Sequence, residues 1–157
     1  MSEPIAPNPW LSRRNLLMGG VAAAAVGGYL WWTRQPPSHE QPRLTVAQAF
    51  AAARAGDVLL VDIRTPQEWR STGVPVGSHQ IDMRREDFMA ALRDLAGGDV
   101  TAPVALICAR GGRSARMTQT LAEAGFVNVV DVPEGMLGSQ SGAGWIRSNL
   151  PVARWDG

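Results

Sequence analysis

Three short apolar runs separated by helical patterns are the feature that most constrains the fold of this chain. They occupy residues 58–63, 103–108 and 127–132, and each is too short for a globular helix. Apolar side chains recur at helical spacing in residues 86–96, and residues 114–124 also read as a helix; a glycine follows each segment. Strands that alternate with helices are typical of an α/β fold. The pattern therefore predicts a central parallel sheet flanked by helices.

Local start and stop signals add two helices at the beginning of this region. Thr45 is a good N-cap for a helix that ends at Gly56. Thr65 followed by Pro66 predicts the start of a second, short helix. We expect a loop at residues 73–77, a short strand at residues 78–82 and a final short helix at residues 145–150.

The first 34 residues have the pattern of an export signal. Ser12, Arg13 and Arg14 precede an apolar stretch at residues 16–32, which resembles a twin-arginine signal or a signal anchor. The arginine pair favours a cytoplasmic N-terminus, so we expect the export machinery to place the rest on the periplasmic side. No Ala-x-Ala site follows the run, which favours anchoring in the inner membrane by residues 16–32, although cleavage stays open. Residues 35–42 are then a Pro-rich linker, and residues 43–157 a single globular domain.

The composition excludes several classes of function. The 15 basic and 14 acidic residues leave the charge near zero, which argues against nucleic-acid binding. One cysteine cannot form a disulfide within the chain. With only His39 and His79 beside it, we expect no metal site built from cysteines and histidines.

The single cysteine, Cys108, ends one of the predicted strands and precedes a glycine- and arginine-rich loop. The loop consists of Ala109, Arg110, Gly111, Gly112, Arg113 and Ser114. A thiol reacts as the thiolate, which a helix N-terminus and nearby arginines stabilise. The glycines let successive N–H groups converge on one point, and arginine suits an oxyanion such as thiosulfate. An inert buried cysteine is the structural alternative, but it needs no flanking positive charge.

These residues resemble the active-site pattern of single-domain rhodaneses, Cys-x-x-Gly-x-Arg-Ser. Residues 60–69 resemble the first signature of that family, with Asp62, Arg64 and Glu68, and residues 125–129, 134–136 and 150–152 resemble its C-terminal signature. The resemblance covers residues 43–153 and implies a rhodanese-like fold. It departs at residues 73–78, which lack the usual histidine, and at residues 137–144, a longer Gly/Ser-rich loop that we expect near the site entrance.

The resemblance implies a sulfurtransferase. Cys108 would take sulfane sulfur from a small anionic donor such as thiosulfate and hold it as a persulfide. The loop from Ala109 to Ser114 would bind that persulfide, and a thiol or cyanide-like acceptor, or a partner protein, would remove the sulfur. No cofactor and no metal are implied.

Three alternatives stay open. A non-enzymatic sulfur carrier or docking module would have the same fold. Related cysteine phosphatases have a loop one residue longer, Cys-x5-Arg, whereas four residues separate Cys108 from Arg113. A Cys–His protease would need His79 as its base.

Asp62 ends a predicted strand at the same sheet edge as Cys108. There it either holds an active-site arginine or a loop amide, or it caps the following turn.

Overall fold

The computed structural model describes residues 38–157. The predicted signal or anchor in residues 1–34 and the first residues of the predicted linker lie outside this range. Within residues 38–157, none of the helices combines the length and the apolar character needed to cross a membrane.

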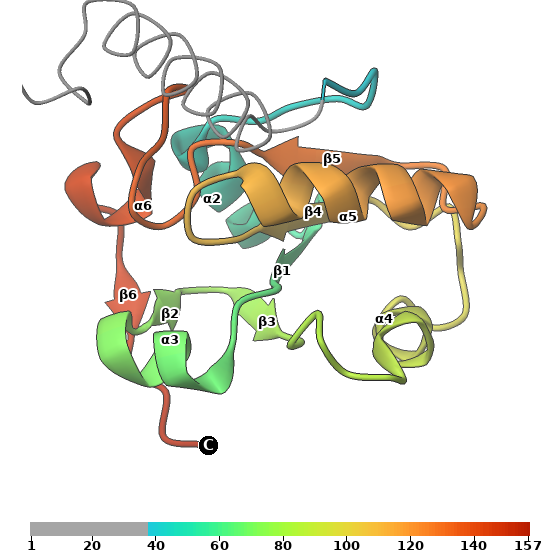
Figure 1. The fold of residues 1–157 in the computed structure, drawn as a ribbon, viewed down its shortest axis with the longest axis horizontal. Coiled ribbons are helices and arrows are strands. Elements are labelled where there is room, and N and C mark those ends of the chain that lie inside the picture. Colours follow the sequence, from blue (N-terminus) through green and yellow to red (C-terminus); the bar gives the residue numbers. More distant parts are fainter. Residues whose placement is uncertain (1–37) are drawn as a thin grey trace, which may run out of the picture. The chain divides into compact units, whose positions relative to one another are not determined.

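Four parallel strands form the central sheet (Figure 1). Their order is β3 (Ser78–Gln80), β1 (Leu59–Asp62), β4 (Val104–Ile107) and β5 (Val129–Val132). β1 pairs with both β3 and β4, and β4 pairs with β5, all in parallel register. The predicted central parallel sheet is thus confirmed, and all four strands end at one edge.

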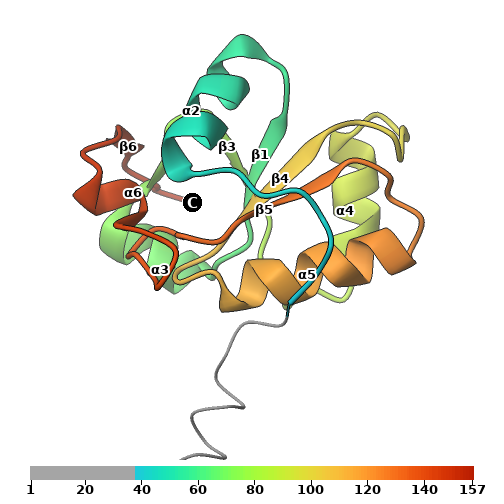
Figure 2. The same ribbon diagram turned by 90° about the horizontal axis from the view of Figure 1, so that it is seen from above.

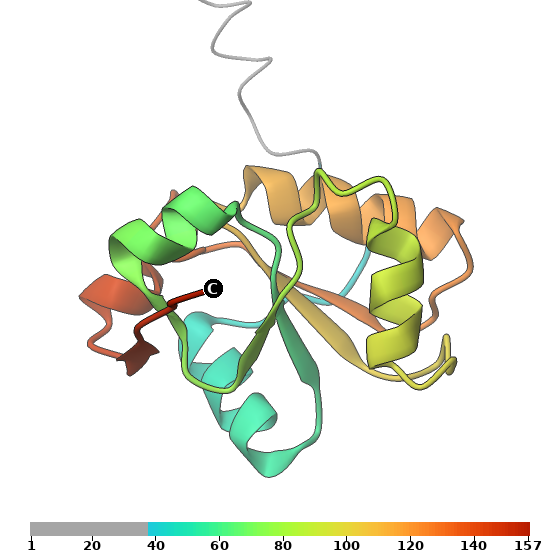
Figure 3. The same ribbon diagram turned by 90° about the horizontal axis from the view of Figure 1, so that it is seen from below.

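Helices cover both faces of this sheet (Figures 2 and 3). α4 (Phe88–Leu95) and α5 (Gly112–Glu123) pack on one face with Val61, Leu106 and Cys108. α2 (Val46–Ala55) and α6 (Gly144–Arg147) pack on the other face with Leu60 and Ile107. Because side chains alternate along a strand, neighbours such as Ile107 and Cys108 belong to opposite faces.

Both predicted N-caps are present. Thr45 accepts a hydrogen bond from the amide of Gln48, 3.2 Å away, and Gly56 ends α2 in the left-handed conformation. α3 (Pro66–Thr72) begins after Thr65, which forms a capping box with Glu68. The side chain of Glu68 is therefore fixed at the first turn of α3.

Two features differ from the sequence prediction. Residues 73–77 were expected to be a loop, but β2 (Val74–Pro75) pairs antiparallel with β6 (Val152–Ala153). A two-residue strand is too short to show an alternating pattern, and its partner lies at the other end of the domain. α5 begins at Gly112 rather than at Ser114, so Arg113 belongs to its first turn.

The last residues of the predicted linker lie along the outer edge of β5. The amide of Asp131 donates to the carbonyl of Pro42, and the amide of Leu44 donates to the carbonyl of Asp131, each at 3.0 Å. The side chain of His39 contacts the carboxylate of Asp131 at 3.1 Å. The chain upstream of α2 is thus hydrogen-bonded to the sheet from His39 onward.

Candidate active site around Cys108

Cys108 follows β4 directly and lies at the carboxyl edge of the sheet. Its side chain is 1% exposed and belongs to the apolar cluster beneath α4 and α5. Its carbonyl accepts the amide of Met136 and the carbonyl of Ala109 accepts the amide of Leu137, both at 2.9 Å. The segment after β5 therefore fixes the backbone from which the thiol projects.

A left-handed turn at Gly111 carries the chain from β4 into α5. Gly111 has φ 82° and lies directly before the first helical residue, Gly112. A Cβ atom at Gly111 would collide with the carbonyl of Pro133. Only glycine therefore fits this position, both for its backbone conformation and for its close approach to the neighbouring chain.

The turn brings the sulfur of Cys108 against the first turn of α5. The amide of Ser114 donates to the sulfur at 3.4 Å, and the thiol donates to the hydroxyl of Ser114 at 3.6 Å. That hydroxyl in turn donates to the carbonyl of Gly111 at 3.0 Å. α5 is 12 residues long, so its dipole also places partial positive charge at the sulfur. The first turn of α5 therefore directs a backbone N–H and the positive end of the helix dipole at the sulfur.

Arg113 makes a bidentate ion pair with Glu68 of α3. The two guanidinium nitrogens are 2.5 and 2.9 Å from the two carboxylate oxygens. Hydrogen bonding from Arg113 is the main reason that the pKa of Glu68 falls to about 2, and the pairing raises the pKa of Arg113. Arg113 directly precedes Ser114, whose amide donates to the sulfur of Cys108, so the ion pair extends from the same turn of α5.

Arg110 is exposed at the tip of the loop. Its guanidinium has no hydrogen-bond or ion-pair partner among residues 38–157. The two arginines of the loop are therefore not equivalent: Arg113 is held by a carboxylate, whereas Arg110 is available to a ligand.

Asp62 lies at the same sheet edge as Cys108 but on the other face. It pairs in register with Ile107, whose side chain packs beneath α2 and α6. The carboxylate of Asp62 is fully buried and accepts the side chain of Arg64 at 2.6–3.0 Å and the Arg64 amide at 3.1 Å. The guanidinium of Arg64 also donates to the hydroxyl of Thr72 at 2.7 Å and to the carbonyl of Gly73 at 2.8 Å. Asp62 thus ties the end of β1 to the end of α3 and makes no hydrogen bond to the Cys108 loop.

Two elements of the site were missed as site residues in the sequence analysis. Glu68 holds Arg113; the sequence showed it only as part of the signature at residues 60–69 and as the capping-box partner of Thr65. The backbone of Met136 and Leu137 supports Cys108 and Ala109, and backbone pairing leaves no side-chain signal. Both contacts join segments that are far apart in the sequence.

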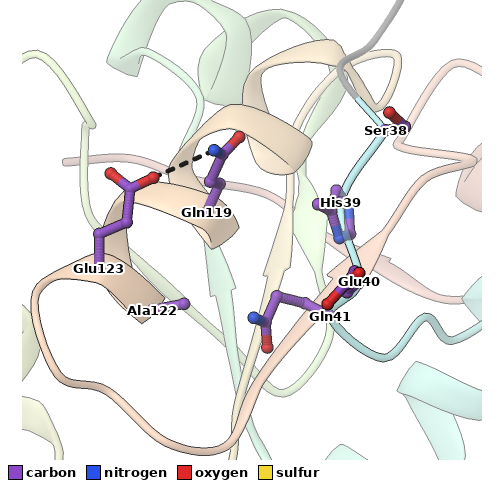
Figure 4. A pocket seen from close by; sticks show the side chains of 7 residues that line it. All are labelled: Ser38, His39, Glu40, Gln41, Gln119, Ala122 and Glu123. Atoms are coloured by element: carbon purple, nitrogen blue, oxygen red, sulfur yellow. Dashed lines mark hydrogen bonds between the residues drawn. The ribbon is translucent and has the colours of Figure 1, made fainter.

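A surface pocket lies away from this site (Figure 4). It is bounded by residues 38–41 and by Gln119, Ala122 and Glu123 of α5. Gln119 and Glu123 hydrogen-bond to each other at 3.0 Å, and no residue of the Cys108 loop lines the pocket. In the part of the chain that the structure describes, no group of His, Cys, Asp or Glu side chains is placed to hold a metal ion.

Comparisons with known proteins agree with this architecture. The model of the rhodanese-like domain family matches residues 45–141. An uncharacterized protein of Rickettsia rickettsii is 26% identical over 117 residues, which cover 66% of this chain and 95% of that protein.

Similar solved structures include two sulfurtransferases. The polysulfide-sulfur transferase homodimer of Wolinella succinogenes is 26% identical with a TM-score of 0.57, over 72% of this chain and 78% of that one. The thiosulfate sulfurtransferase of Pseudomonas aeruginosa shares the fold at 22% identity, with a TM-score of 0.58, over 74% of this chain and 21% of that one. With the family model matching more than half of its length, the chain belongs to the family of rhodanese-like domains.

Proposed function

We propose that this protein is a sulfurtransferase that carries sulfane sulfur as a persulfide on Cys108. The observation that carries the proposal is the sulfur of Cys108 at the N-terminus of α5, 3.4 Å from the amide of Ser114. The family membership of the chain and the named activity of the Wolinella succinogenes relative support the same class of reaction.

The reaction has two half-reactions. The thiolate of Cys108 attacks the outer sulfur of the donor, a new S–S bond forms, and the old S–S bond breaks with its electron pair going to the leaving group. With thiosulfate as donor, the leaving group is sulfite. An acceptor thiolate or cyanide then attacks the outer sulfur of the persulfide and restores the Cys108 thiolate. The covalent intermediate predicts ping-pong kinetics.

The loop residues have separate roles in this proposal. The amides from Ala109 to Ser114 surround the outer sulfur of the persulfide, as backbone N–H groups do in other anion sites. Gly111 and Gly112 allow the turn, and Arg110 attracts anionic donors. Arg113 stabilises the loop through Glu68. Cys108 is the only cysteine of the chain, so the acceptor must be another molecule.

A persulfide-loading assay tests the proposal. The purified chain is incubated with a sulfane-sulfur donor and examined by peptide mass spectrometry. We expect the peptide containing Cys108 to gain the mass of one sulfur atom, which is lost again on treatment with cyanide. A matched sample of Cys108→Ser that gains the same mass would overturn the proposal.

We also propose that the domain acts on the periplasmic side of the inner membrane. The support is the sequence of residues 1–34, with Arg13 and Arg14 before the apolar run at residues 16–32. Residues 43–157 would then be the exported domain. A reporter fused after Gly157 that is active only in the cytoplasm would contradict this location.

A further inference from the structure

Residues 133–137, which we call the support segment, lie between β5 and α6 and hold the backbone of the Cys108 loop. The amide of Met136 donates to the carbonyl of Cys108, and the next amide donates to the carbonyl of Ala109, both at 2.9 Å. A Cβ atom at Gly135 would lie 2.6 Å from the carbonyl oxygen of Ala109, so the two backbones are in direct contact. The position of Cys108 therefore depends on the position of the support segment.

The support segment also lies against the turn that leads from Cys108 into α5. A Cβ atom at Gly111 would collide with the carbonyl of Pro133. The amide of Ser114, which donates to the sulfur of Cys108, follows this turn directly. Because closely packed backbones transmit displacements, a shift of the support segment would change how the sulfur faces α5.

Glu134 is the one charged residue of the support segment, and its side chain is buried. One carboxylate oxygen accepts the amide of Val46, the first residue of α2, at 3.1 Å. The other oxygen accepts the amide of Gly144, the first residue of α6, also at 3.1 Å. The first amides of a helix have no acceptor within the helix, so the carboxylate satisfies both. Glu134 thus ties the support segment to two helices on the face of the sheet opposite the Cys108 side chain.

We infer that Glu134 is a positioning residue for the transfer of sulfur to Cys108. The inference rests on the proposed sulfurtransferase function and adds to it a residue that does not touch the substrate. By fixing the support segment, the carboxylate fixes the backbone of Cys108 and the approach of its sulfur to the amide of Ser114. A misplaced nucleophile reacts more slowly, even when the change lies away from the reacting atoms.

Glu134→Gln tests the inference because it keeps the shape of the side chain. Glutamine offers one carbonyl oxygen, and its NH₂ group faces the second amide, so one of the two hydrogen bonds is lost. Loading of Cys108 is followed in the full chain by peptide mass spectrometry, with thiosulfate and with cysteine persulfide as donors. We expect loading to be on the order of tenfold slower than in wild type. Removal of a nearby negative charge would by itself favour the thiolate, so charge alone predicts the opposite result.

Amide hydrogen exchange shows whether the effect reaches Cys108 through the support segment. In Glu134→Gln, the amides of Met136 and Leu137 should exchange on the order of tenfold faster, while the amides of β4 change by less than about twofold. A loss of global stability would instead speed exchange in the support segment and in β4 by the same factor. The exchange pattern therefore distinguishes local positioning from general destabilisation.

The matched control is Asp131→Asn. Asp131 is also buried, and its carboxylate contacts the side chain of His39 at 3.1 Å. The substitution removes one buried carboxylate with the same change of charge and similar shape. It should load sulfur within about twofold of wild type and leave the exchange of Met136 and Leu137 unchanged. If Glu134→Gln fails to fold, Glu134→Asp replaces it, because the shorter carboxylate keeps the charge but cannot reach both amides.

The outcomes separate the inference from the function on which it rests. Equal loading rates in wild type and the Glu134 variant would overturn the inference and leave the sulfurtransferase proposal standing. Slower loading with a uniform rise in exchange, or the same loss of rate in Asp131→Asn, would also overturn it. A folded wild-type chain that loads from neither donor would overturn the proposed function, and with it the role of Glu134.

Discussion

Glu68 and Arg113 join α3 to the first turn of α5 through two hydrogen bonds of 2.5 and 2.9 Å. This pair is the only side-chain ion pair of the Cys108 loop among residues 38–157. It holds the first turn of α5 against α3 and so stabilises the position of the loop.

The ion pair between Glu68 and Arg113 should make the free energy of unfolding depend on pH in the acidic range. The pKa of Glu68 is lowered from 4.5 to about 2 by its bonds to Arg113, so the unfolded chain binds a proton more readily than the folded one. The stabilisation is complete above pH 4.5 and is lost as the pH falls from there towards 2. Urea unfolding of wild type and Glu68→Gln should differ at pH 6 and converge towards pH 2. A difference that stays constant over this range would contradict the assignment.

The hydroxyl of Ser114 should contribute to the rate of sulfur loading. It contacts the sulfur of Cys108 and is held by the carbonyl of Gly111. When the thiol loses its proton, the hydroxyl can turn from the carbonyl of Gly111 and donate to the sulfur instead. Ser114→Ala then removes about one hydrogen bond to the thiolate, roughly 1 kcal/mol, and should slow loading about fivefold. Thr120→Ala is the matched control, because this threonine bonds only to the helix carbonyl of Arg116 on the exposed side of α5. Equal rates for the two variants would refute the role of Ser114.

Gly111 should be far less replaceable than another glycine of the same backbone conformation. Gly111 and Gly98 both have φ 82°, but only a Cβ at Gly111 meets a backbone carbonyl, that of Pro133. Gly98→Ala should cost about 1 kcal/mol of unfolding free energy for the left-handed conformation alone. Gly111→Ala should cost about 1–3 kcal/mol more. Urea unfolding measures both, and equal losses would show that the close contact with Pro133 is unimportant.

Asp62 should matter for stability and not for chemistry. Asp62→Asn leaves the buried guanidinium of Arg64 without its counter-charge, which should cost about 3–5 kcal/mol of unfolding free energy. The loading rate of the folded fraction should stay within about twofold of wild type, because Asp62 lies on the opposite face from Cys108. A well-folded Asp62→Asn chain that loads sulfur much more slowly would instead place Asp62 in the reaction.

Much of the fold was predictable because its signals are local. Thr45, Gly56 and Thr65 specify helix ends through hydrogen bonds to nearby backbone, and the apolar runs specify buried strands. β2 and β6 were not predictable in this way. These two strands, residues 74–75 and 152–153, pair with each other from opposite ends of the domain, with Val74 opposite Ala153 and Pro75 opposite Val152.

In the candidate site, too, the features with local sequence signals were predictable and those that depend on distant contacts were not. The turn at Gly111 and the position of Cys108 after a strand follow from adjacent residues. The ion pair between Arg113 and Glu68 does not follow from adjacent residues, because the two side chains meet only when α3 and α5 are packed together. The face on which Asp62 lies depends on strand register, and a shift of one residue would reverse it.

Mass spectrometry of Cys108 after exposure to a sulfane-sulfur donor tests the central claim most directly. The full chain should gain one sulfur atom on the Cys108 peptide, and cyanide should remove it with formation of thiocyanate. Cys108→Ser should gain none under the same conditions. An unmodified Cys108 with both cysteine persulfide and thiosulfate, in a chain shown to be folded, would contradict the account.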